Sequence, residues 1–288
     1  MAKQAMAEAS TKACSACGSD AASRYRFTVN GCPIRQCPAC GLGHAEPGGF
    51  EPTSYYTADY FNGSHGDGYA DYRGAEPVLR KEFARTVAFI RKIVPGGRLL
   101  DIGCAYGFFL QEAKPFYDVS GIELAEEAAA YSRTNGLGVH AGVADEAAMA
   151  HVGPLDVITL FDVIEHLPEP HDVLSLAARH LKPGGIVVLT TGDFGSLAAK
   201  LMGPKWRLMT PPQHLWFFTR ESIRRMGARS GLTMTHFSHP GKVVPLSLIG
   251  FQLRRMLGLR PAPSAGANRI GVPVNLFDAM RVVLRKES

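Results

Sequence analysis

Between residues 98 and 191, short apolar runs alternate with segments of helical periodicity, and this alternation restricts the fold more than any other feature. Several runs are apolar throughout, which is typical of strands buried on both faces of a parallel sheet. We therefore predict an α/β fold with a doubly wound, mostly parallel sheet. The predicted strands are 98–102, 119–123, 138–141, 156–161 and 186–191, and the predicted helices are 108–114, 125–134 and 170–181.

The first predicted strand leads into a turn of small residues. An apolar run ends in Asp101, and small residues follow at Gly103, Ala105 and Gly107 before apolar residues resume at Phe108. Glycine permits positive φ and carries no Cβ, so a flat or anionic group can lie directly on the main chain. Such a turn is a weak indication alone, and we look to the neighbouring strand ends for groups that would share its ligand.

The other strand ends carry groups that suit a nucleoside. Glu123 ends the second strand, 22 residues after Asp101, near the offset of about 20 at which an acid accepts both ribose hydroxyls. The alternative role for Glu123 is that of an acid favoured at a helix N-terminus. Asp145, after the third strand, either accepts from an adenine amino group or caps the next helix. Phe161 and Asp162 close the fourth strand and complete the predicted cofactor site.

Four motifs occur in a fixed order: DIGCAYG, GIE, FDVIEHL and LKPGG. Together they resemble the class I S-adenosylmethionine-dependent methyltransferases over residues 80–240, with Ala105 where the pattern most often has glycine. The resemblance implies S-adenosyl-L-methionine as cofactor and a seven-stranded sheet whose last strand is antiparallel. Strand six would be 232–237, and strand seven would come from the terminal run 278–286, preceded by 272–276.

Four of the six cysteines form two Cys-x-x-Cys-Gly pairs, which are Cys14 with Cys17 and Cys37 with Cys40. In a chain with no secretory pattern, this spacing favours a metal over disulfides. Between the pairs lie two strand-like runs, 24–29 and 32–35, joined by Asn-Gly, which is typical of a hairpin. The segment resembles a zinc ribbon with a closed, structural Zn2+ site, and Cys32 is not expected to be a ligand.

We predict five segments. Residues 1–11 are expected to be disordered and 12–46 to form the zinc-ribbon-like module. Residues 47–76 form a tyrosine-rich lid or linker, and 77–288 form the methyltransferase domain, which opens on an amphipathic helix at 77–94. Within that domain, 241–262 is an inserted, basic amphipathic helix. It is either a cap over the substrate or an interfacial helix that makes peripheral membrane contact through 245–260.

Two histidines are candidates for the chemistry. Methyl transfer is an in-line displacement, and a hydroxyl nucleophile also needs a base. His214 follows the fifth strand and is the preferred catalytic base, whereas His166 follows the fourth strand and is expected to organise the pocket. The segment around His214 resembles sugar and natural-product methyltransferases. Pro211 and Gln213 replace the Tyr and Glu of the sugar C-methyltransferases, which argues against C-methylation.

The predicted function is S-adenosylmethionine-dependent methylation of a small-molecule or saccharide acceptor, at oxygen. One alternative is an RNA methyltransferase of the ribosomal-RNA type, and another is a non-catalytic binding protein with the same fold. A net charge of +5 is mild, and the ribbon hairpin offers only Arg24, Arg26 and Arg35, so nucleic acid is not favoured. No run of about 18 apolar residues and no signal peptide occurs, so a cytoplasmic location is expected. The oligomeric state and the acceptor stay open.

Overall fold

The computed structural model describes residues 13–50, 71–256 and 269–287. The predicted disorder at 1–11 and most of the tyrosine-rich stretch, 51–70, therefore lie outside the described residues. So does the end of the predicted 241–262 helix, from 257 onward. No helix in the described part of the chain is long and apolar enough to span a membrane.

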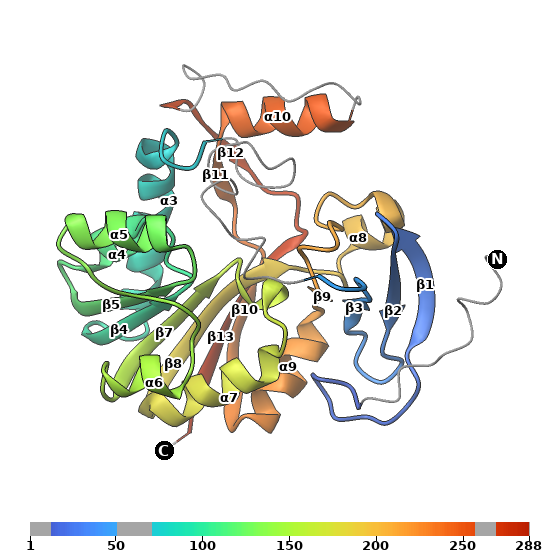
Figure 1. The fold of residues 1–288 in the computed structure, drawn as a ribbon, viewed down its shortest axis with the longest axis horizontal. Coiled ribbons are helices and arrows are strands. Elements are labelled where there is room, and N and C mark those ends of the chain that lie inside the picture. The colour runs from blue at the N-terminus through green and yellow to red at the C-terminus, as the bar shows by residue number, and fades with distance from the viewer. Residues whose placement is uncertain (1–12, 51–70, 257–268, 288) are drawn as a thin grey trace.

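A seven-stranded sheet forms the centre of the molecule (Figure 1). Its strand order is β10-β13-β8-β7-β4-β5-β6, and β13 is antiparallel to both of its neighbours while the other pairs are parallel. The prediction of a doubly wound sheet with an antiparallel last strand is confirmed. The strands are β4 (Gly97–Ile102), β5 (Tyr117–Glu123), β6 (Gly138–Ala141), β7 (Leu155–Phe161), β8 (Leu181–Gly192), β10 (Leu232–Ser238) and β13 (Ala279–Lys286).

Helices cover both faces of this sheet, because successive strand residues point to opposite sides. Leu99 and Val157 pack toward α3, α4 and α5, whereas Leu100 and Ile158 pack toward α6, α7 and α9. Two separate apolar cores result, one on each face. The helices are α3 (Glu76–Arg91), α4 (Phe108–Ala113), α5 (Glu126–Thr134), α6 (Glu146–Ala150), α7 (Pro170–His180) and α9 (Arg220–Arg229).

All strands except β13 end at the same edge, which we call the carboxyl edge. The two strands that follow β4 in the chain, β5 and β6, lie on one side of it in the sheet, and the next strand, β7, lies on its other side. In a doubly wound sheet, ligands bind at this reversal, beyond the strand ends. The fold therefore directs attention to the ends of β4, β5, β7 and β8.

The cysteine module is built on a hairpin, as predicted. Strands β1 (Arg24–Val29) and β2 (Cys32–Gln36) pair antiparallel, and Asn30 and Gly31 both have the positive φ of a hairpin turn. The sheet then adds β3 (Gly43–Ala45) and, unexpectedly, β9 (Trp216–Phe217) from far along the chain.

The module also shares its interior with the large sheet. Cys37, Cys40 and Leu42 belong to the same apolar core as Phe218 and Met226. At the surface of this junction, the Arg229 guanidinium donates to the Ser15 carbonyl at 2.7 Å, and the Thr219 hydroxyl donates to the Cys40 carbonyl at 3.0 Å.

Three local features differ from the sequence-based expectation. Strand β8 begins at Leu181, because Leu181 pairs with Leu155, so the Pro-Gly-Gly turn lies inside the strand at a register shift. A short helix α8 (Leu197–Met202) follows β8. The segment expected to be helical from 241 begins with β11 (Lys242–Pro245), which pairs with β12 (Gly271–Val274), and helix α10 (Leu246–Met256) follows.

Candidate functional site

The turn after β4 has the backbone geometry expected of a ligand-binding loop. Gly103, Ala105 and Gly107 have φ of 75°, 46° and 74°. Glycine is required at Gly107, where a Cβ would lie 2.5 Å from a methyl group of Leu137, and at Gly103, where it would lie 2.4 Å from a methyl group of Val163. Ala105 adopts the same left-handed region as a non-glycine residue, and an interaction with Glu123 holds it there.

Glu123 lies at the end of β5 with its carboxylate buried beside this turn. One of its oxygens accepts a hydrogen bond from the Ala105 N–H and the other accepts from the Ala125 N–H, both at 2.8 Å. Burial raises the pKa of Glu123. A carboxylate oxygen has two lone pairs, so each oxygen can still accept a ribose hydroxyl.

Asp101 is buried at the end of β4, in the same neighbourhood. The Thr159 hydroxyl donates to it at 2.6 Å. Burial raises the pKa of Asp101 to about 7, against the effect of Thr159, and the charge of Glu123 acts in the same direction as burial. The predicted pair of acids at adjacent strand ends is thus brought together.

Tyr72 covers the turn from the other side. It is the only tyrosine of the predicted lid within the described residues, since Tyr55, Tyr56, Tyr60 and Tyr69 are outside them. Its ring stacks on those of Tyr106 and Phe108, at centroid distances of 5.9 and 5.6 Å. Burial, with the charges of Asp101 and Glu123, raises its pKa. The end of the tyrosine-rich stretch therefore packs against the candidate cofactor site.

A cavity of about 470 Å³ opens beside this turn. Arg73 lies at its wall, over the ring of Tyr131 at 4.7 Å and over that of Tyr106 at 5.8 Å. The remaining lining residues are Asp71, Gly74, Glu76 and Glu127.

The remaining predicted cofactor residues have defined local roles. Asp145 caps α6, accepting from the Ala148 N–H at 2.8 Å, so the capping alternative is present and the adenine contact stays a prediction. Phe161 packs its ring edge-on against Phe109 at 4.8 Å. Asp145 and Phe161 therefore each make a contact within the protein itself.

Asp162 is half-buried at the end of β7, in an unusual backbone conformation with φ of 55°. One of its oxygens accepts from the Thr190 hydroxyl at 2.9 Å, and the other is paired with the Lys242 ammonium at 2.8 Å. Although burial opposes ionisation, Lys242 holds the pKa of Asp162 below its usual value. Lys242, which lies on β11, was not among the residues predicted for this site.

His166 and His214 lie next to each other although they are far apart in the sequence. His166 is hydrogen-bonded to the residue before His214, Gln213, which lies 47 positions further along the chain. Their rings lie 4.7 Å apart at 72°. The Nδ1 of His166 donates to the Gln213 carbonyl at 2.9 Å, and the Nδ1 of His214 donates to the Leu208 carbonyl at 2.8 Å. Because carbonyls only accept, both rings carry their proton on Nδ1. Burial lowers the pKa of His166 to about 4 and that of His214 to about 3, so both are neutral at neutral pH.

Glu165 lies close to both His166 and His214. Its carboxyl group is buried, and its Oε2 has no hydrogen-bond partner within the described residues. Burial, followed by the charge of Asp162, raises the pKa of Glu165 to about 8. Ligand atoms of Glu165, His166 and His214 all lie within 4.8 Å of one another, a donor set that a divalent cation could use.

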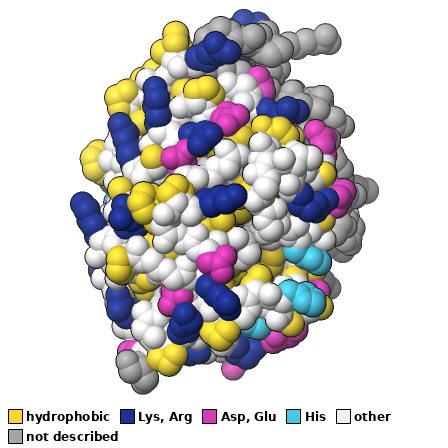
Figure 2. Space-filling view, turned by 90° about the vertical axis from the view of Figure 1, so that its left-hand side faces the viewer, with side chains coloured by type: hydrophobic (Ala, Val, Ile, Leu, Met, Phe, Trp, Pro, Cys, Tyr) yellow, Lys and Arg dark blue, Asp and Glu magenta, His cyan; other side chains and the backbone are white. Residues whose placement is uncertain are grey.

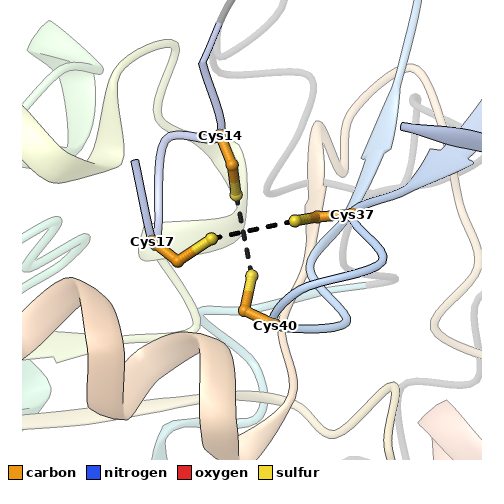
Figure 3. A group of neighbouring side chains, drawn as sticks. All are labelled: Cys14, Cys17, Cys37 and Cys40. Carbon is orange, nitrogen blue, oxygen red and sulfur yellow. Dashed lines mark hydrogen bonds between the residues drawn. The ribbon is translucent and has the colours of Figure 1, made fainter. Parts of the chain in front are cut away.

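The four predicted zinc ligands form a separate cluster (Figure 3). The Sγ atoms of Cys14 and Cys40 lie 3.6 Å apart and those of Cys17 and Cys37 lie 3.8 Å apart. A tetrahedron with Zn–S bonds of about 2.3 Å has edges of about 3.8 Å, so this set fits a zinc ion. Cys32 lies outside the cluster and interacts with the Asn30 carbonyl.

Comparison with known proteins adds to this geometry. Residues 75–237, more than half of the chain, match a family model described as a methyltransferase domain. The chain is 37% identical over 103 residues to the ubiquinone biosynthesis O-methyltransferase of Bordetella avium (strain 197N), covering 33% of this chain and 43% of that protein. It is 31% identical over 155 residues to the protein of the same name from Thiobacillus denitrificans (strain ATCC 25259 / T1), covering 49% and 67%.

The chain thus spans about half the length of the first curated relatives that it matches. Among solved structures, a chain from the complex between the Haloferax volcanii Trm112 methyltransferase activator and a methyltransferase superposes with a TM-score of 0.51. The sequences are 15% identical, and the superposition covers 76% of this chain and 96% of the other. This likeness concerns the fold.

Proposed function

Because the chain belongs to the S-adenosylmethionine-dependent methyltransferases, the family that its residues 75–237 match, we propose that it methylates a hydroxyl oxygen of a small-molecule acceptor. The observation that supports oxygen as the methylated atom is the similarity to ubiquinone biosynthesis O-methyltransferases. Neither of the two curated relatives described above is named for a saccharide or RNA acceptor.

The cofactor supplies, when bound, a methyl group on a positively charged sulfur. We propose that Glu123 accepts hydrogen bonds from its ribose hydroxyls and that the backbone from Gly103 to Gly107 lies against it. The buried carboxylate of Glu123 and the three positive φ values of the turn support this role. Asp145 remains the candidate for the adenine amino group.

His214 is proposed to receive the hydrogen bond of the acceptor hydroxyl. Its Nδ1 is fixed by the Leu208 carbonyl, which leaves Nε2 as an acceptor of hydrogen bonds. Since burial keeps the ring neutral, this lone pair is available at neutral pH. His166, whose ring lies against it, would hold the His214 ring in place.

We also propose that Cys14, Cys17, Cys37 and Cys40 bind a structural zinc ion. All four possible ligands are thiols of the protein, so no coordination position is left for a substrate. The module is joined to the methyltransferase body through β9, and its charge does not favour nucleic acid. Figure 2 shows the side of the molecule opposite this module, and on that face too Lys and Arg side chains are interspersed with Asp and Glu instead of forming a continuous basic patch.

The proposal is tested by incubating the protein with labelled S-adenosylmethionine and a panel of phenols, catechols and aliphatic alcohols. A parallel reaction contains structured RNA as the acceptor. We expect label in a methyl ether of one small molecule, identified by mass spectrometry. In His214→Ala, kcat/KM for that acceptor should fall about tenfold or more through loss of one hydrogen bond, with unchanged affinity for S-adenosylhomocysteine. Label found only in RNA, or only on nitrogen or carbon, would contradict the proposal.

A further inference from the structure

A third histidine, His239, is hydrogen-bonded to an acid, Asp193, at the carboxyl edge, outside the site described so far. Asp193 directly follows β8 and His239 directly follows β10. The Nε2 of His239 lies 2.8 Å from Oδ2 of Asp193. This pair was not predicted from the sequence, and β13 lies between the two strands that carry it.

Asp193 is a fixed, buried carboxylate. It is 5% exposed, and its second oxygen accepts from the Gly195 N–H at 2.8 Å. A carboxylate in this position can only accept, so the shared hydrogen bond places a proton on Nε2 of His239. Asp193 thereby selects the tautomer of the ring and its orientation, as the orienting acid does in histidine-based catalysis.

His239 is held but not enclosed. Asn275 donates to its carbonyl at 3.1 Å, and the rings of Phe237 and Phe277 lie edge-on to the imidazole at 5.0 and 6.4 Å. The side chain is 25% exposed. Its Nδ1 makes no hydrogen bond to any residue that the structure describes, so the Nδ1 lone pair is not used within the described part of the chain.

Two chains of contacts connect this pair to residues of the proposed acceptor site. Three residues after His239, Lys242 is paired with Asp162 at the end of β7. On the other side, the Asp193 N–H donates to the Asp278 carbonyl at 2.8 Å, and the Asp278 carboxylate binds Arg207, a charged neighbour of His214. The pair therefore lies at the carboxyl edge on the β8 side of β7 and is connected through Lys242 to Asp162 and through Asp278 to Arg207.

We propose that His239, oriented by Asp193, is the catalytic base that removes the proton from the acceptor hydroxyl. This inference rests on the proposed O-methylation and deepens it. The hydroxyl oxygen forms the new bond to the methyl carbon as the carbon–sulfur bond breaks and leaves its electron pair on sulfur. The hydroxyl proton moves to Nδ1 of His239, and the Asp193 carboxylate stabilises the imidazolium.

The arrangement separates two tasks among the histidines. His166 and His214 are hydrogen-bonded to carbonyls, which do not compensate a charge as a carboxylate does. They can orient a hydroxyl but cannot readily hold its proton. His239 has the anionic partner that an imidazolium needs, and Asp193 acts on the reaction through it as a positioning residue.

Steady-state kinetics of His239→Gln, with the panel acceptor that wild-type protein methylates, test the assignment. We expect kcat to fall about 100-fold or more, as is usual for loss of a general base. The acceptor KM and the calorimetric affinity for S-adenosylhomocysteine should stay within about twofold, because neither binding step uses the proton transfer. Imidazole added to His239→Ala should restore part of the rate.

Asp193→Asn should lower kcat less than the His239 variants do. The double variant should be no slower than His239→Gln alone, because the two residues act as one unit. His236→Gln is the matched control. His236 lies within β10, three residues before His239, and its Nε2 is hydrogen-bonded to the Ser238 hydroxyl instead of an acid. Its variant should retain wild-type kcat.

Three results would overturn the assignment. If His239→Gln retains kcat within about threefold while His214→Ala loses about 100-fold, His214 is the base. If the losses in Asp193→Asn and His239→Gln multiply in the double variant, the pair does not act as a unit. If wild-type protein methylates no hydroxyl in the panel, the proposed function fails and this inference fails with it.

Discussion

Replacing Glu123 by Gln distinguishes a ribose-binding carboxylate from one that only holds the turn. The native side chain accepts from two backbone N–H groups, those of Ala105 and Ala125. Glutamine keeps the shape but replaces one accepting oxygen by an NH2 group. The N–H group of either Ala105 or Ala125 must then face the NH2 group of the glutamine, which is also a donor.

The cost in stability follows from this count. A buried donor without a partner costs about 1–3 kcal/mol. Burial raises the pKa of Glu123, so the charged form is itself penalised in the folded protein, and the neutral amide removes part of that penalty. We therefore expect a loss toward the lower end of the range, about 1–2 kcal/mol, measured by urea unfolding.

The effect on binding is separate. A hydrogen bond to a charged acceptor is worth about 1.5–3 kcal/mol, so losing one ribose contact should weaken binding about 10- to 100-fold. Isothermal titration calorimetry with S-adenosylhomocysteine measures this directly. Glu126→Gln is the control, because Glu126 is exposed on α5 and pairs with Arg133 at the surface. If Glu123→Gln loses the expected stability but binds the ligand as the wild type does, the ribose contact is refuted.

Two further predictions concern the metal and the effect of pH. Metal analysis of purified protein should find one zinc per chain, lost in Cys37→Ser with a lower Tm, and a metal-free protein of full stability would contradict the zinc site. Burial raises the pKa of Asp101 to about 7, so the folded protein keeps a proton that the unfolded chain releases from about pH 4 upward. The contribution of Asp101 to the free energy of unfolding therefore falls as the pH rises from about 4 to about 7. Asp101→Asn should flatten that part of the urea-derived pH profile, and parallel profiles for variant and wild type would exclude the raised pKa.

The large sheet was predictable because its information is local. Apolar runs such as 98–102 and 138–141 match β4 and β6 to within one residue. Parallel strands end at a common edge, so Asp101 and Glu123 could be placed together from sequence alone. The hairpin was equally accessible, since Asn30-Gly31 supplies the two positive φ values that it needs.

Long-range pairings were not predictable in this way. Strand β9 has two residues, too few for any periodicity, and forms only because β3 offers it an edge. The ion pair between Lys242 and Asp162 and the contact between His239 and Asp193 likewise join distant segments. The lowered pKa of His214, to about 3, is caused by burial in the tertiary fold and could not be inferred from the neighbouring residues in the sequence.

The pairing of β3 with β9 has a consequence for the synthesis of the chain. As the protein emerges from the ribosome, the cysteine module is translated early, but the strand that completes its sheet appears only with Trp216 and Phe217. Until then β3 presents an open edge, which is prone to pairing with other chains. A fragment that ends near residue 50 would therefore aggregate more readily than the full chain, and a circular permutant that begins at α8 would translate β9 before its partner.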